Sequence, residues 1–351
     1  MHIREFDFDL PPELIAQEPP RDRGGSRLLY LRRDTGEIRH SVVARLPDLL
    51  APGDLLVVND TRVFPARLLG HRVPSGGTVE CLLVSRIGEE SGGELWEALM
   101  HPGQKLKPGA RVVFEGARVL HGEVLERRFY GRRVIRLSTP DGSPVESAVD
   151  AIGHVPLPPY IRRPDEPSDR ERYQTVFARA RGSVAAPTAG LHFTPELLAR
   201  LEARGIGMAR ITLHVGYGTF QPVRVEEIEQ HRIEPERYEI SEPAAAAINR
   251  ALAEGRRVVA VGTTSTRTLE AVAMAHGGRV APGGGLVDLF IRPGHRFLVV
   301  GGLVTNFHLP RSSLLILVAA FAGRELALAA YREAVAERYR FYSYGDAMLI
   351  L

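Results

Sequence analysis

Residues 184–220 contain two apolar segments that each end in a polar, glycine-bearing loop; the stretch begins VAAPTAGLHFT and ends ITLHVGYGTF. The first segment stops before His192, and a helix is predicted to follow, with Thr194 as its cap and Pro195 at the first helical position. The second segment, residues 208–215, alternates as a strand does, contains His214 and breaks at Gly216. Ligands of α/β folds bind at the carboxyl ends of strands. We therefore expect the active site at these two loops.

The rest of the chain predicts two kinds of domain. From residue 183 to 351 strands alternate with helices, which indicates a mostly parallel sheet or barrel. Between residues 66 and 149 short alternating segments are separated by glycine-bearing turns, which is typical of a small antiparallel barrel. We expect an α/β fold: a barrel-like α/β catalytic domain, residues 1–65 and 150–351, that carries an inserted all-β domain, residues 66–149.

Individual elements follow from periodicity and capping signals. Strands are expected at residues 27–31, 37–43, 55–58, 79–85, 94–100, 111–114, 119–125, 132–137, 183–187, 208–215, 257–261, 286–291, 297–300 and 347–351. Helices are expected after Thr194 and at residues 170–180, 242–254, 268–276, 313–322 and 325–338.

Composition excludes several classes of protein. The chain of 351 residues is 44% hydrophobic and 25% charged, and its single cysteine, Cys81, excludes internal disulfides and zinc-ribbon spacing. Its longest apolar run, residues 314–322, is far shorter than the ~20 residues of a membrane-spanning helix, and no signal core is visible. We expect a cytoplasmic protein without a membrane partner. The positive charge is almost all arginine, which reflects either phosphate recognition or the base composition of the genome.

Five expected strands are followed by polar loops, which predicts a polar rim at one edge of the sheet. The loops comprise residues 59–62, 187–192, 216–219, 262–267 and 305–311. The fourth of them, GTTSTR, opens a helix, so its N–H groups and hydroxyls suit an anion, although simple helix capping explains the same residues. It lacks the lysine and glycine spacing of a phosphate-binding P-loop.

Three histidines lie at strand ends: His192, His214 and His308. Their spacing does not match a metal site, so we expect none, and each is either a general acid or base or a packed loop histidine. Asp60 and Arg62 pair as a clamp where the β insertion leaves, or bind ligand.

Several long stretches together resemble the S-adenosylmethionine:tRNA ribosyltransferase-isomerase family of queuosine synthesis. They include FDFDLPPELIAQEPP, PGDLLVVNDTRVFPARL, VPLPPYIRR, GSVAAPTAGLHFT, LHVGYGTFQPV, VGTTSTRTLE, TNFHLPRSSLLILVAAFAG and YRFYSYGDAMLI, in this order. The resemblance implies transfer of the ribosyl group of S-adenosylmethionine to 7-aminomethyl-7-deazaguanine at the wobble position of tRNA with a GUN anticodon. The ribose is rearranged to give epoxyqueuosine, while adenine and methionine are released. S-adenosylmethionine is consumed, and no cofactor is expected.

Residue chemistry suggests roles for that reaction. His192 or His214 is the expected base for the ribose 5′ carbon, and Asp60 or Asp346 would offset a positive charge. Thr263, Thr264, Ser265 and Arg267 would hold the methionine carboxylate, and Tyr217 would stack on a base. The remaining expected substrate contacts are Arg62, Thr188, Gly190, Thr219, Asn306, His308, Arg311 and Tyr344.

The arginines expected to grip RNA phosphates are Arg127, Arg128 and Arg132 of the insertion and Arg162 and Arg163 of the return link. A solvated hairpin explains the first three equally well. We expect a monomer. Two other functions remain open: a metal-dependent hydrolase on an α/β barrel, and a tRNA-binding protein without catalytic activity.

Overall fold

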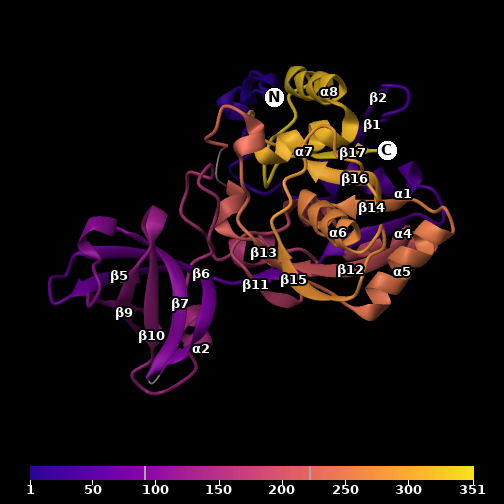
Figure 1. The fold of residues 1–351 in the computed structure, drawn as a ribbon. Coiled ribbons are helices and arrows are strands. Elements are labelled where there is room, and N and C mark those ends of the chain that lie inside the picture. The colour runs from indigo at the N-terminus through magenta and orange to yellow at the C-terminus, as the bar shows by residue number, and fades with distance from the viewer. Residues whose placement is uncertain (91, 221–222) are drawn as a thin grey trace.

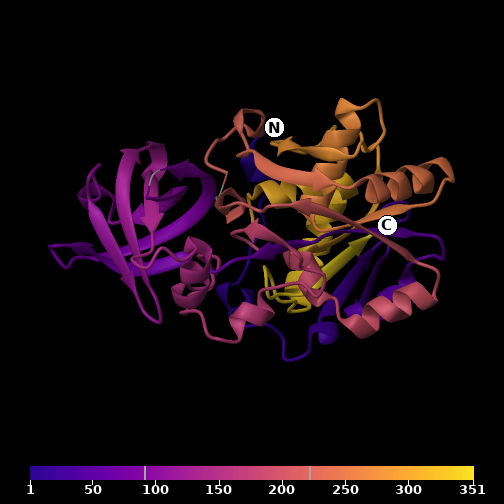
Figure 2. The same cartoon turned by 90° about the horizontal axis from the view of Figure 1, so that it is seen from below.

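The computed structural model describes residues 1–90, 92–220 and 223–351; within these ranges the side chains of Tyr130, Thr219 and Phe220 are outside the description. The chain forms two lobes, a large α/β domain and a smaller β-barrel, and both termini lie in the large domain (Figures 1 and 2).

The large domain is built on a nine-stranded mixed sheet. Its strand order is β15-β13-β12-β3-β14-β16-β17-β1-β2, so β15 and β2 form its two edges and the described strands make an open sheet. The parallel centre consists of β12 (Gly207–Leu213), β3 (Leu55–Asn59), β14 (Val258–Val261) and β16 (Val300–Asn306). Around it lie β17 (Ala347–Ile350), β1 (Arg27–Leu31), β2 (Ile38–Val42), β13 (Glu236–Ile240) and β15 (Gly283–Val287).

The central strands are buried on both faces, which explains their continuous apolar sequence. Leu55 and Val57 of β3 point into one apolar cluster, while Leu56 and Val58 point into another. The first cluster is covered by α5 (Glu242–Ala253), α6 (Thr263–Ala275), α7 (Ser313–Ala322) and α8 (Arg324–Ala336). The second is covered by α1 (Leu46–Leu49) and α4 (Pro195–Ala203).

The small domain is a closed antiparallel barrel of six strands. Its strands are β5 (Arg67–Val73), β6 (Thr78–Glu90), β7 (Gly93–His101), β8 (Arg111–Glu115), β9 (Val119–Arg127) and β10 (Arg132–Ser138). Alternating residues such as Val79, Cys81 and Leu83 point inward and are buried. The helix α2 (Val145–Ile152) buries Val145 and Val149 in the same core.

The chain crosses twice between the lobes, and the two crossings pair with each other. The outgoing strand β4 (Thr61–Val63) runs parallel to the returning strand β11 (Ala180–Ser183). Before β11 the chain passes through α3 (Asp169–Arg172).

The 3-10 helices are η1 (Ile3–Phe6), η2 (Pro12–Leu14), η3 (Arg23–Gly25), η4 (Val43–Arg45), η5 (Gly103–Lys105), η6 (Phe129–Gly131), η7 (Thr188–His192), η8 (Tyr217–Phe220) and η9 (Ile228–Gln230).

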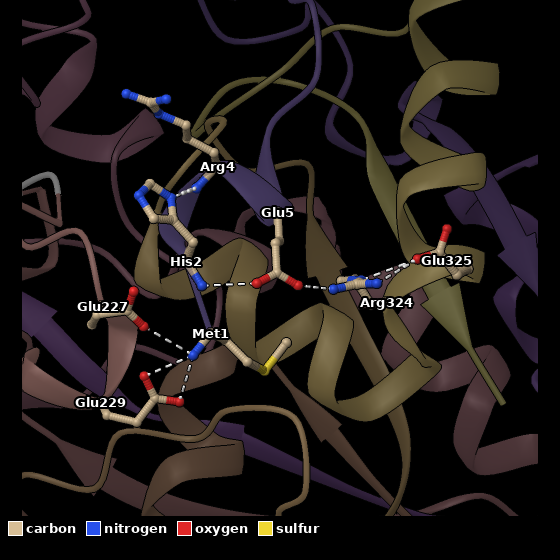
Figure 3. Close-up of polar contacts among 8 residues, drawn as sticks. All are labelled: Met1, His2, Arg4, Glu5, Glu227, Glu229, Arg324 and Glu325. Atoms are coloured by element: carbon tan, nitrogen blue, oxygen red, sulfur yellow. Dashed lines mark hydrogen bonds and ion pairs between the residues drawn. The ribbon is translucent and has the colours of Figure 1, made fainter.

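The N-terminal residues fasten a distant loop. The Met1 amine lies 3.2 Å from Glu227 and 3.0 Å from Glu229 (Figure 3). The backbone adds two hydrogen bonds, from the Ile3 N–H to the Glu226 carbonyl at 2.8 Å and from the Ile228 N–H to the Met1 carbonyl at 3.0 Å. The loop that enters β13 is therefore held at its middle.

The predicted fold class is confirmed: an α/β domain carries a small antiparallel β-barrel. The main sheet is open, however, and does not close into the barrel-like form that was expected for it. The domain limits at residues 65, 66, 149 and 150 stay a prediction. The caps expected of Thr194 and Ser241 are present, since each side chain accepts a backbone N–H of the first helical turn.

Several element predictions differ from the structure. The helix expected at residues 170–180 ends at Arg172, and only Ser183 of the strand expected at residues 183–187 belongs to a strand. β5 was missed, and the strands expected at 286–291 and 297–300 are β15 and β16, displaced along the chain. α6 begins at Thr263, five residues earlier than expected.

Among the described residues no single helix is long and apolar enough to cross a membrane. α7 and α8 reach the required length only as a pair, and they are bent by 116°.

Candidate active site

The parallel strands β3, β12, β14 and β16 end at one edge of the sheet, as predicted. Asn59, the last residue of β3, links the ends of β3 and β12. Its side-chain amide donates to the Leu213 carbonyl at 2.9 Å, and its Oδ1 accepts the Leu213 N–H at 3.0 Å. The side chains that follow these strands nevertheless lie in three different parts of the domain.

A cleft of about 1220 Å³ separates the barrel from the main domain near this edge. From the main domain it is lined by His214, Glu236 and Arg267, and from the barrel by Trp96 and Arg132. His214 and Arg267, two of the residues predicted for the site, therefore face one space that both lobes enclose.

His214 is half-buried at the wall of this cleft. Its Nδ1 lies 3.0 Å from the Thr61 hydroxyl, and its Nε2 lies 3.4 Å from Arg237 Nη2. Loss of water lowers the pKa of the imidazole, and the Arg237 charge lowers it further against the opposing effect of Asp60 and Glu239. His214 is therefore neutral at pH 7 and is able to accept a proton.

Gly182 makes room for this imidazole. Its φ is +150°, and a Cβ at this position would lie 2.6 Å from His214 Nδ1. The hydroxyl of Ser183 next to it lies 2.8 Å from the Thr61 hydroxyl and accepts the Val215 N–H at 2.8 Å. The two paired segments that connect the lobes, β4 and β11, thus position the histidine.

Arg267 is held by a buried ion pair. Its Nη1 donates to Glu236 Oε2 at 2.7 Å and its Nε donates to the Leu289 carbonyl at 3.0 Å, while only 4% of Arg267 and 6% of Glu236 are exposed. The second nitrogen, Nη2, is buried without a hydrogen-bond partner among the described residues. Glu236 also accepts the Gly216 N–H at 2.9 Å. A buried donor that lacks a partner beside a cleft is suited to bind an anion.

Several hydroxyls at the start of α6 donate hydrogen bonds to nearby backbone carbonyls. The Ser265 hydroxyl donates to the Val261 carbonyl at 2.9 Å, and the Thr266 and Thr268 hydroxyls bond four residues back in the same way. Only the Thr264 hydroxyl is buried without a partner in this turn as described. Thr263, Thr264 and Ser265 do not line the cleft, whereas Arg267 on the same helix does.

His192 lies in different surroundings. It is buried, with its Nε2 3.2 Å from Asn306 Nδ2, and it borders a cavity of only about 10 Å³ beside Tyr344. Burial, Arg340 and Arg23 lower its pKa to about 4. Asn306 also donates to the Tyr342 carbonyl at 2.9 Å, while its Oδ1 has no partner among the described residues.

His308 packs in the core near α8. Its ring Nε2 lies 2.8 Å from the Thr305 hydroxyl, and its backbone N–H donates to the Tyr331 hydroxyl at 3.1 Å. Burial lowers the pKa of the imidazole to about 3. The three histidines expected together thus occupy three places, and only His214 faces the large cleft.

Asp60 and Arg62 do not form the expected clamp. Asp60 is buried, accepts the Thr212 hydroxyl at 2.6 Å and pairs with Arg179 at 3.1 Å. Arg62 is exposed on β4. Asp60 acts on His214 through its charge and contacts no cleft space directly.

Four other residues predicted to contact the substrate make contacts within the protein instead. Arg311 is exposed and paired with Asp7. The Tyr344 hydroxyl donates to Asp169 at 2.9 Å, and Asp346 accepts the backbone N–H groups of Arg27 and Arg340. At Gly190 a Cβ would lie 2.8 Å from Phe177 and Thr175, so close packing requires this glycine.

Three further residues complete the predicted set. Thr188 is half-buried at the start of η7. Tyr217 lines a second, neighbouring cleft. The side chain of Thr219 is outside the described residues, so the prediction for it has no structural counterpart.

The arginines expected to bind RNA divide into paired and unpaired ones. Arg128 pairs with Glu97 and Glu126 at 3.3 Å, Arg132 with Glu97 at 2.7 Å and with Glu234, and Arg163 with Asp169 at 2.6 Å. Arg127 and Arg162 are exposed and form no ion pair within the described ranges.

Sequence reasoning missed Glu236 and Trp96 of the cleft, and it assigned Arg132 to RNA binding. Glu236 begins the strand ERYEI, in which Arg237 and Glu239 are also charged, so its own charge gave no signal that it belongs to the site. Its partner Arg267 lies 31 residues away, so no local pattern joins them. In the described part of the chain, no three metal-ligating side chains gather into a group that would hold a metal ion.

Comparison with known proteins agrees with these observations. The family model described as queuosine biosynthesis protein matches residues 3–350. The chain is 54% identical over 351 residues to the S-adenosylmethionine:tRNA ribosyltransferase-isomerase of Symbiobacterium thermophilum, covering all of both chains. It is 54% identical over 350 residues to the enzyme of the same name from Anaeromyxobacter sp. strain Fw109-5, covering 100% of this chain and 99% of the relative.

A solved structure points the same way. The crystal structure of the S-adenosylmethionine tRNA ribosyltransferase from Thermotoga maritima is 39% identical, with a TM-score of 0.55. The match covers 99% of this chain and 100% of that one. From the family model and these full-length relatives it follows that the chain belongs to the queuosine biosynthesis protein family.

Proposed function

We propose that the protein transfers the ribosyl moiety of S-adenosylmethionine to 7-aminomethyl-7-deazaguanine at the wobble position of tRNA and isomerises it, which gives epoxyqueuosine-tRNA, adenine and methionine. Relatives with more than half of their residues in common carry the name of this activity over their whole length. The observation that carries the proposal is the interdomain cleft, which His214 and Arg267 both line, with the Nη2 of Arg267 buried and unpartnered among the described residues.

Each wall of the cleft suits one part of S-adenosylmethionine. Arg267 offers its free N–H to the methionine carboxylate, and Glu236 holds the guanidinium in place. The cleft contains six arginines and six carboxylates among its described residues, so it suits a substrate that carries both an anionic carboxylate and a cationic sulfonium.

His214 serves as the base in this proposal. The sulfonium acidifies the neighbouring ribose 5′ carbon, and the neutral imidazole accepts the proton that this carbon loses. His192 is less suited, because its ring borders a cavity of only about 10 Å³. Asp60 stabilises the protonated imidazole by its charge.

The target base reaches the cleft only when it leaves the stack of the anticodon loop. The proposed partner is accordingly the anticodon loop of a tRNA with a GUN anticodon. We place residues 1–65 and 150–351 in the catalytic domain and residues 66–149 in the insertion that encloses the cleft. No cofactor is needed, since the sulfonium itself activates the ribose.

A single copy of the chain supplies both walls of the cleft, which is the argument for a monomer. The cytoplasm is the proposed location, since the tRNA substrate is found there.

Incubation of the protein with S-adenosylmethionine and an anticodon stem–loop that bears the aminomethyl base tests this function. Free adenine and a mass gain on the RNA are expected. Binding of the RNA without adenine release would instead identify a tRNA-binding protein without catalytic activity. His214→Ala should slow adenine release by about 10²–10⁴-fold, whereas His192→Ala should slow it far less.

A further inference from the structure

A second cleft, of about 1330 Å³, lies beside the first one, along the same barrel strands β6 and β7. Its walls are the barrel strands, the proline-rich return link with Pro156, Pro158 and Pro159, and the loop that precedes β13. Four residues line both this cleft and the first one: Arg132, His231, Arg232 and Glu234. The two clefts therefore meet along one line of side chains.

The two clefts differ in charge. Among the described residues the second cleft contains six arginines but only three carboxylates, whereas the first contains six of each. Three histidines, His101, His154 and His231, add donors to the second cleft. An excess of guanidinium groups in a concave surface attracts a polyanion.

Half of these arginines have no carboxylate partner. Arg67 pairs with Glu80 at 2.7 Å, while Arg132 and Arg163 pair as described above. The other three, Arg162, Arg224 and Arg232, are exposed and form no ion pair within the described ranges. Their charges are available to a ligand.

The unpaired arginines stand on well-fixed backbone. Arg224 and Arg232 flank the segment that the N-terminal residues hold through Glu226, Glu227 and Glu229 (Figure 3). The Arg162 N–H donates to Gln17 Oε1 at 2.8 Å. Fixed backbone reduces the entropy lost when their side chains bind phosphates.

We propose that this second cleft binds the phosphate backbone of the RNA, with Arg162, Arg224 and Arg232 as the phosphate contacts. The inference rests on the proposed function and adds to it the surface that the RNA occupies. With the backbone in the second cleft, the extruded base crosses the line of Arg132 and Glu234 and enters the first cleft beside His214. One cleft thus holds the strand, and the other holds the reacting groups.

An exposed aromatic side chain borders this surface. Phe129 is 87% exposed on η6, the turn whose last residue, Gly131, lines the second cleft. Aromatic rings stack on unpaired bases. Phe129 is accordingly placed to stack on a nucleotide that neighbours the bound backbone.

The test compares two triple variants in binding a fluorescently labelled anticodon stem–loop with a GUN anticodon. Arg162→Ala/Arg224→Ala/Arg232→Ala should raise the Kd at least about tenfold at low salt. The slope of log K against log salt should fall by about 2, since each phosphate contact in a single strand contributes ~0.7. S-adenosylmethionine binding, measured by calorimetry for the double variant Arg162→Ala/Arg224→Ala, should remain unchanged because neither residue lines the first cleft.

The matched control removes three exposed arginines that line neither cleft: Arg200→Ala/Arg204→Ala/Arg279→Ala. Its RNA affinity should stay within about twofold of the parent protein. Equal weakening in both triples, or an unchanged salt slope in the first, would overturn the proposed surface. A parent protein that binds the stem–loop but releases no adenine refutes the proposed activity instead, so the two failures are distinguishable.

Discussion

The unpaired nitrogen of Arg267 leads to a quantitative prediction. Arg267→Met removes the N–H that we place opposite the methionine carboxylate. A hydrogen bond between charged groups contributes about 1.5–3 kcal/mol, so the Kd for S-adenosylmethionine should rise by about 10- to 150-fold. Arg267→Lys should recover little of this affinity, because an ammonium group cannot bond Glu236, the Leu289 carbonyl and a ligand in the same planar arrangement.

The substitution also affects folding, because it leaves the Glu236 carboxylate buried without its partner. Loss of one member of a buried ion pair costs about 3–5 kcal/mol. The double variant Arg267→Met/Glu236→Gln removes both charges, and glutamine retains an acceptor for the Gly216 N–H. It should regain most of the lost stability while its affinity for S-adenosylmethionine stays low.

The assay combines calorimetric titration with S-adenosylmethionine and urea unfolding of each variant. The control is Arg257→Met/Asp54→Asn, which removes an ion pair of the same 2.7 Å distance at the opposite end of β14, away from the cleft, although Arg257 is 31% exposed. This control should bind S-adenosylmethionine as the parent does. A folded Arg267→Met/Glu236→Gln protein that binds it within threefold of the parent would refute the reasoning.

Three other perturbations have defined outcomes. His214→Ala should slow adenine release by about 10²–10⁴-fold, and the acid limb of kcat/KM in the parent should lie below pH 6.5, since burial lowers the pKa of His214; a limb that survives in His214→Ala assigns the base elsewhere. Gly182→Ala should lower kcat without removing any functional group, because its Cβ would displace the imidazole from a distance of 2.6 Å, and an unchanged rate would show that the ring position is unimportant. His308 has a folded-state pKa of about 3, so the unfolded chain binds the additional proton below pH 6.5; its contribution to stability is complete above pH 6.5, falls by about 2 kcal/mol at pH 5 and is lost further toward pH 3. Urea unfolding at pH 7 and pH 5 should show a smaller difference in His308→Gln than in the parent, and an equal difference would contradict this assignment.

Local patterns predicted most of the elements. The apolar strand at residues 55–58 and the caps Thr194 and Ser241 depend on neighbours within four residues, so the sequence was sufficient to identify them. β15 contains three consecutive glycines, which disfavour a strand, and it forms only as an edge paired with β13. Tertiary pairing overrode the local preference there.

The site was only partly predictable for a related reason. The carboxyl end of a strand determines the edge at which a side chain lies, and this placed His214 and Arg267 correctly near one space. It does not determine the depth of a side chain, so His192 and His308 were expected beside His214 and lie buried elsewhere. The wall contributed by the barrel, including Trp96 and Arg132, depends on how two domains face each other, which no local pattern contains.

The pairing of β1 with β17 has a consequence for the order in which the chain folds during synthesis. Leu28 of β1 lies opposite Ala347, and Leu55 of β3 lies opposite Gly207 and Val258. All six barrel strands, in contrast, lie between residues 67 and 138. A nascent chain on the ribosome therefore completes its barrel while β1 and β3 still lack their parallel neighbours, and those apolar strands are the segments most exposed to aggregation until translation ends.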